Sequence, residues 1–125
     1  MKVMSAEDYL RKHGNKRSKY HAEATFIDGI RFASKAEARR YAQLRVMEDN
    51  GVIRDLVLQP EYDIEVNGTR VATYKADFAY WDNERNERVV EDVKGVRTAT
   101  YRLKKKLVEA LYGFEIEEIN AKDMY

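Results

Sequence analysis

An Asn67-Gly68 dipeptide between two apolar segments constrains the fold of this chain more than any other feature. Asn-Gly easily adopts the positive backbone angles of a type I′ turn, and that turn matches the twist of two antiparallel strands. Apolar and acidic residues alternate over 62–66 before the dipeptide, and a strand is expected over about 70–81 after it. The sequence therefore predicts a β-hairpin in the middle of the chain.

Turn-forming and helix-capping residues predict the other elements. Ser34 and Glu37 have the spacing of a capping box, and Asn50-Gly51 ends the helix that the box begins. We expect one α/β (α+β) domain with the core order helix, strand, strand, strand, helix, strand. In chain order the expected elements are a helix over 6–12 capped by Ser5, a basic linker over 13–19, a hairpin around Asp28-Gly29, a helix from Ser34 to Asn50, strands over 53–58, 62–66, 70–81 and 88–94, a helix from Thr98 or Thr100 to Gly113, and a strand over 114–119.

Composition excludes several kinds of site. The 125 residues include no cysteine and two histidines, which leaves no disulfide, no thiol nucleophile and little material for a histidine metal cluster. No apolar run approaches the roughly 20 residues of a membrane span, and the N-terminal residues lack the apolar segment of a secretory signal. We therefore expect a cytoplasmic protein without membrane contact.

Charged residues in two neighbouring apolar segments indicate the chemistry. They are Asp77 in the first segment and Glu91, Asp92 and Lys94 in the second. A charge in a half-buried strand costs on the order of several kcal/mol unless it is paired or bound to a cation. These strands are therefore expected to hold a metal ion or a structural ion pair.

Strand alternation divides these charges between two faces. Side chains alternate across a sheet, so Asp77 should point away from Tyr74, Ala76, Phe78 and Tyr80, which are expected to share the core face. Asp92 and Lys94 should share one face of the next strand, where they can meet Asp77. Two adjacent carboxylates repel each other unless a divalent cation keeps both ionised, and ligation by oxygen alone suits Mg²⁺ or Mn²⁺.

Glu91 should lie on the opposite face, and two interpretations of it stay open. In the first, it forms a salt bridge to the second long helix, with Arg102 as the partner. In the second, a bulge in the strand makes Glu91 the metal ligand in place of Asp92. Gln59, which precedes Pro60, is likewise either a hydrogen-bonding group near the site or simply the end of a strand.

These residues resemble the PD-(D/E)XK nuclease superfamily, in which an Asp-bearing strand precedes a strand ending in (D/E)-x-K. Over about residues 20–119 the chain more narrowly resembles a family of small, largely uncharacterised phage-encoded proteins assigned to that superfamily. One departure is that Asp77 follows alanine rather than proline. The segments that carry the narrower resemblance are Asp28–Glu37, Leu58-Gln59-Pro60, Ala76-Asp77-Phe78 and Val90–Gly95.

The resemblance implies a restriction-endonuclease-like fold over 20–125, with a mixed sheet flanked by helices. Residues 1–19, which lie before it, are expected to form the short helix and basic linker. The resemblance also implies a Mg²⁺- or Mn²⁺-dependent DNA endonuclease, acting in the bacterial host cytoplasm if phage-encoded. Asp77, Asp92 and the carbonyl of Val93 would hold the cation. Lys94 would stabilise developing negative charge, and Glu37 would complete the metal shell directly or through water.

The expected partner is DNA, and no small-molecule cofactor is expected. Branched or replicating phage DNA is the favoured substrate, by analogy with small junction resolvases, and a symmetric homodimer is the expected assembly. The alternative is a catalytically inactive DNA-binding or recombination-accessory protein that keeps the fold. The residues expected to contact DNA are Lys16, Arg17, Lys19, Lys75, Arg97, Thr98, Thr100, Tyr101, Lys104 and Lys105.

Overall fold

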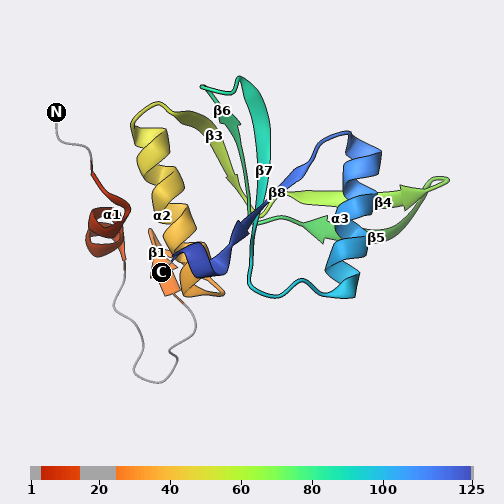
Figure 1. Ribbon diagram of the computed structural model, residues 1–125, viewed down its shortest axis with the longest axis horizontal. Helices are drawn as coiled ribbons and strands as arrows, with labels where there is room; N and C mark the ends of the chain where they lie inside the picture. Colours follow the sequence, from red (N-terminus) through yellow and green to blue (C-terminus); the bar gives the residue numbers. More distant parts are fainter. Residues whose placement is uncertain (1–3, 15–24, 125) are drawn as a thin grey trace.

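The computed structural model describes residues 4–14 and 25–124 (Figure 1). It confirms a mixed α+β fold in the expected order, with a short helix and hairpin before the core. One expected strand is divided in two. The elements are α1 (Ala6–His13), β1 (Thr25–Ile27), β2 (Ile30–Phe32), α2 (Lys35–Asp49), β3 (Ile53–Leu58), β4 (Glu61–Val66), β5 (Thr69–Lys75), β6 (Phe78–Asp82), β7 (Glu87–Lys94), α3 (Ala99–Tyr112), β8 (Ile116–Asn120) and a closing 3₁₀ turn, η1 (Ala121–Met124).

The predicted turns have the expected backbone geometry. Asn67 and Gly68 have φ of 50° and 82°, and Asp28 and Gly29 have φ of 53° and 76°. Both central residues of a type I′ turn require positive φ, so the two tight hairpins are confirmed at the positions that the dipeptides predicted.

Side-chain caps begin the three α-helices of the described residues. The hydroxyl of Ser5 accepts from Asp8 N, that of Ser34 from Glu37 N, and that of Thr98 from Tyr101 N. Each of these bonds satisfies one of the backbone N–H groups that the first turn of a helix leaves without a partner. Thr98, rather than Thr100, is therefore the cap of α3.

The central sheet has four strands in the order β3-β6-β7-β8, of which β7 and β8 run parallel and the other pairs antiparallel. The strands β4 and β5 form a separate ribbon, and β1 and β2 a small hairpin. Since α3 connects β7 to β8, this parallel pair has a helical crossover, as such a pair requires.

The expected strand over 70–81 is wrong, because the chain bends at Ala76-Asp77 and passes from the ribbon into the sheet. The facing strand bends at Gln59-Pro60. Gln59 N donates to Asp77 O at 2.9 Å and Ala76 N to Pro60 O at 3.0 Å, so the two strands bend together. Gln59 takes a φ of 51° at this point.

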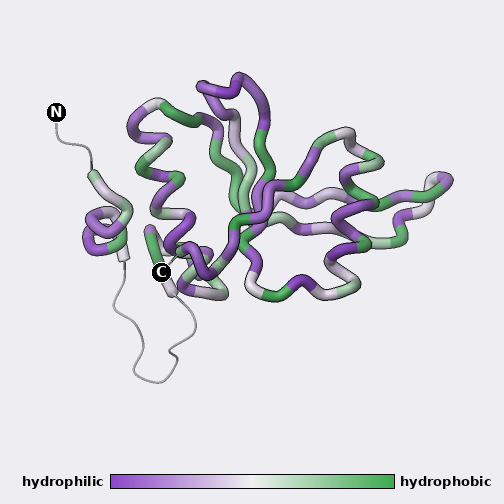
Figure 2. Tube along the Cα trace, in the orientation of Figure 1, coloured by the Kyte–Doolittle hydropathy of each residue, from purple (hydrophilic) through white to green (hydrophobic). Residues whose placement is uncertain are grey.

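Because of the bend, the four residues that were expected to share one core face lie in two different clusters. Tyr74 and Ala76 pack in a buried cluster with Val108 of α3, whereas Phe78 and Tyr80 pack in a second cluster with residues of α2. The helix α2 lies on one side of the sheet, and α3 with the ribbon lies on the other (Figure 1). Hydrophobic segments concentrate along the middle of the sheet, and the turn between β6 and β7 is hydrophilic (Figure 2). No helix within the described residues is long and apolar enough to cross a membrane.

Candidate functional site

Asp77 and Asp92 meet at the bend, as strand alternation predicted. The register pairs Phe78 with Glu91, so the residue before β6 lies beside Asp92 of β7. The backbone N–H of Asp77 donates to Asp92 Oδ1 at 3.1 Å, and the N–H of Val93 donates to Asp77 Oδ2 at 2.7 Å. Each carboxylate thus accepts a hydrogen bond from a backbone N–H of the neighbouring segment, which fixes the direction of both carboxylates.

Asp92 is completely buried, and its second oxygen has no partner within residues 4–14 and 25–124. The exposed fraction of the residue is 0%, and Oδ2 accepts no hydrogen bond from any described residue. Burial raises the pKa of Asp92 to about 7, although the charge of Lys94 and the N–H of Asp77 oppose this rise. A buried carboxylate oxygen without a donor is rare in folded proteins and marks a position where a ligand can bind.

Glu37 and Asp77 are half-buried, and their electrostatics are linked. Burial is the largest cause that raises the pKa of each carboxyl group. The charge of Asp77 raises the pKa of Glu37 further, whereas Lys94 lowers the pKa of both acids. The first turn of α2 therefore brings Glu37 into the electrostatic field of Asp77 and Lys94.

Lys94 lies between the carboxylates and α3. Its Nζ is 4.3 Å from the centre of the Tyr101 ring, a cation–π contact. The hydroxyl of Tyr101 donates to Glu118 Oε2 at 2.7 Å, and Arg97 Nε donates to Glu118 Oε1 at 3.0 Å. These contacts hold the ring against which the lysine packs.

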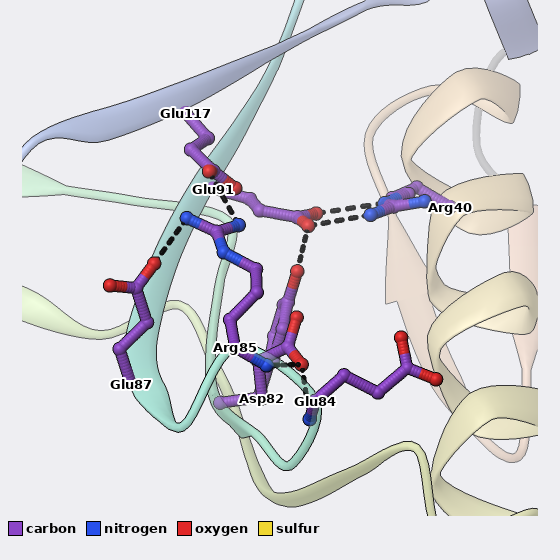
Figure 3. A network of polar contacts seen from close by, with 8 residues as sticks. Arg40, Asp82, Glu84, Arg85, Glu87, Glu91 and Glu117 are labelled. Atoms are coloured by element: carbon purple, nitrogen blue, oxygen red, sulfur yellow. Dashed lines mark hydrogen bonds and ion pairs between the residues drawn. The ribbon is translucent and has the colours of Figure 1, made fainter.

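Glu91 turns to the other face, where it forms a buried ion pair with Arg40 of α2 (Figure 3). Arg40 Nε and Nη2 donate to the two carboxylate oxygens at 2.8 and 2.6 Å, and the hydroxyl of Tyr80 also donates to Oε2. The salt bridge was predicted to reach Arg102 of the second long helix; it forms instead with the first long helix, so the predicted helix and the predicted partner are both wrong. Strand phase alone cannot show which helix covers which face.

The residues expected to contact DNA have varied surroundings. Thr100 and Lys75 are exposed, and Lys75 Nζ is 3.7 Å from Glu61 Oε1. Thr98 caps α3, Tyr101 is buried, and Arg97 is engaged with Glu118, as described above. Lys104 Nζ donates to Thr73 O at 3.2 Å, and Lys105 Nζ is 3.4 Å from Glu109 Oε2. Lys16, Arg17 and Lys19 lie outside the described residues.

Sequence reasoning missed Arg40 and Arg31. Arg40 follows Glu37 by three positions and so lies on a neighbouring part of the helix surface, which is the one signal for it. Arg31 alternates outward between the apolar Ile30 and Phe32, a pattern that every strand surface shows. Neither the pairing of Arg40 with Glu91 nor the position of Arg31 near Asp77 could be predicted before the packing of α2 and of the first hairpin was known.

The oxygen donors suit a hard divalent cation, but they do not form a complete ligand set. Within residues 4–14 and 25–124, no group of three or more His, Asp or Glu side chains lies close enough to hold a metal ion. Asp92 Oδ2 and Asp77 supply carboxylate oxygens, the ligands that Mg²⁺ prefers. Because Asp92 Oδ2 accepts no hydrogen bond from a described residue, this orphaned oxygen can bind a cation. Further ligands would come from Glu37, a backbone carbonyl or water.

Residues 17–121 match the family model described as protein of unknown function (DUF1064). The chain belongs to this DUF1064 family. The match includes Glu37, Asp77, Asp92 and Lys94 and leaves α1 outside it. No curated protein and no solved structure gives a significant match.

Proposed function

We propose that this DUF1064 protein is a DNA endonuclease that hydrolyses phosphodiester bonds with Mg²⁺ or Mn²⁺. The observation that supports it best is the orphaned oxygen of fully buried Asp92 beside Asp77. A chain that built only a core would neither bury this oxygen without a donor nor place a second carboxylate next to it. A cation at this position would compensate both costs.

Each site residue has a role in this reaction. Asp77 and Asp92 would hold the cation, with Glu37 and the Val93 carbonyl as the further candidate ligands. When bound, the cation supplies Lewis-acid activation of a phosphate and of water. Lys94, whose charge acts on Glu37, Asp77 and Asp92, would stabilise the negative charge that develops on the phosphate. Tyr101 would hold the Lys94 amine in place through the cation–π contact with its ring.

We also propose a specific fold type for this domain. The order helix, three strands, helix, strand and the mixed sheet suit a restriction-endonuclease-like core of the PD-(D/E)XK type. We propose branched or replicating phage DNA as the substrate and a symmetric pair of chains as the active form, because two copies can cut two strands.

A cleavage panel tests this proposal. Purified protein is incubated with linear, nicked, single-stranded and four-way-junction DNA in Mg²⁺, Mn²⁺ or EDTA. Cleavage is expected only with the cations, and Asp92→Asn and Lys94→Ala should each lower it by about a hundredfold to a thousandfold, as the removal of charge-stabilising groups does. Glu65→Gln, an exposed carboxylate of the ribbon, is the matched control and should cut normally. Normal cutting by either site variant would disprove the assignment.

One observation favours a second candidate, a DNA-binding protein of the same fold without catalysis. The acidic side chains of the described part of the chain do not gather into a ready metal site, and Asp77 Oδ2 is occupied by Val93 N–H. This candidate predicts salt-dependent DNA binding that is unchanged by EDTA, with no cleavage of any substrate in the panel.

A further inference from the structure

A small pocket lies beside the bend, between the first hairpin and Asp77. Its volume is about 110 Å³. Its polar lining combines the two half-buried acids of the site, Glu37 and Asp77, with Arg31 and with Gln59, the candidate hydrogen-bonding group near the site. The lining residues are Ile30, Arg31, Phe32, Glu37, Leu58, Gln59, Asp77 and Phe78.

Arg31 is exposed at the mouth of this pocket and makes no hydrogen bond or ion pair with any described residue. Two carboxylates line the same pocket, yet the arginine pairs with neither. Arg40, by contrast, is held by both of its carboxylate bonds to Glu91. A guanidinium has a planar array of donors that fits two oxygens of a phosphate, and among the described residues that array has no partner.

Gln59 occupies a backbone conformation that is costly for glutamine. Its φ of 51° lies in the left-handed region, which glycine and asparagine adopt far more readily. The backbone is held there by the bond from Gln59 N to Asp77 O. The side-chain amide is exposed and has no partner among the described residues. Strained residues of this kind cluster at ligand sites, where their side chains are needed in one direction.

We infer that Arg31 and Gln59 together bind a backbone phosphate of the DNA at the mouth of this pocket. The arginine supplies charge and paired donors, and the amide N–H₂ of Gln59 supplies a further donor. Both residues act as positioning residues, because they hold the bound DNA strand next to Glu37 and Asp77. This inference rests on the proposed function, since it takes the substrate to be nucleic acid.

Arg31→Gln and Gln59→Gly test the inference, with Arg70→Gln as the matched control. Arg70 is an exposed arginine of the ribbon whose side chain has no partner among the described residues. Affinity for a labelled four-way junction is measured in EDTA at several KCl concentrations. Arg31→Gln should weaken binding about tenfold and reduce the salt slope by about one, since one phosphate contact is lost. Arg70→Gln should change neither.

Gln59→Gly separates a binding role from a structural one. Glycine suits the positive φ, so the melting temperature should stay equal or rise. Affinity should nevertheless fall by about threefold to tenfold with an unchanged salt slope, because an uncharged donor is removed.

The two proposals can fail separately. If Arg31→Gln binds as tightly as Arg70→Gln, or Gln59→Gly binds as tightly as wild type, the phosphate site is overturned. If wild type binds DNA without cutting it and Arg31→Gln still weakens binding, catalysis is overturned and the phosphate site stands. If wild type binds no DNA, both are overturned.

Discussion

The buried carboxyl group of Asp92 makes stability depend on pH. Its pKa rises from 3.8 in the unfolded chain to about 7 in the folded protein. Between these values the folded state binds more protons than the unfolded chain, so stability falls as pH rises. The stability that protonated Asp92 contributes is fully present below about pH 4 and is lost as the pH rises through about 7. The raised pKa values of Glu37 and Asp77 act in the same direction.

Asp92→Asn should therefore stabilise the metal-free protein at pH 8. The expected gain is about 2–4 kcal/mol, because the substitution removes a charge whose burial raises the pKa of Asp92 from 3.8 to about 7. At pH 4 the gain should disappear, since Asp92 is then protonated. Urea unfolding at the two pH values measures the difference. Glu65→Gln, an exposed control, should show no such dependence, and a stability loss at pH 8 in Asp92→Asn would contradict the argument.

Glu91→Gln should give the opposite pattern. It leaves the guanidinium of Arg40 buried without a charged partner, which costs about 3–5 kcal/mol. The protein that remains folded should still cut DNA, since Glu91 lies on the face away from Lys94. Unfolding and cleavage are measured on the same preparation. An inactive but fully stable Glu91→Gln protein would instead make Glu91 the metal ligand.

Among the helices and strands, turn-forming and helix-capping residues predicted most of the fold. Asn67-Gly68, Asp28-Gly29 and the caps Ser34 and Thr98 act through local backbone geometry, which a sequence contains in full. The bend at Ala76-Asp77 could not be predicted in this way. Apolar residues alternate straight through it, and the break becomes visible only where Gln59-Pro60 on the facing strand bends with it.

Two threonines at the start of α3 give a prediction for that helix. Thr98 accepts from Tyr101 N at 3.1 Å, whereas Thr100 is exposed in the first turn and caps nothing. Thr98→Ala should lower the free energy of unfolding by about 1 kcal/mol. Thr100→Ala, the matched control, should change it by less than about 0.5 kcal/mol. Equal losses in both variants would mean that the cap contributes little.

At the scale of the whole molecule, the site depends on how two buried clusters meet. Phe78 and Val89 belong to the cluster under α2, and Ala79 and Val90 to the cluster under α3. Strand alternation predicted that Asp77 and Asp92 share a face. It could not predict that α2 delivers Arg40 to one face while its first turn delivers Glu37 to the end of the other, because helix packing is set by contacts far apart in the chain.

A cation that binds this site should stabilise the entire fold. If Mg²⁺ at ten times its dissociation constant binds only the folded protein, it adds about 1.4 kcal/mol to the free energy of unfolding. The gain should grow from pH 5 to pH 8, because below about pH 7 the cation must displace a proton from Asp92. Thermal unfolding with and without MgCl₂, against KCl of equal ionic strength, measures it. Asp92→Asn should lose the gain while Glu65→Gln keeps it, and an equal gain in both variants would place the cation elsewhere on the molecule.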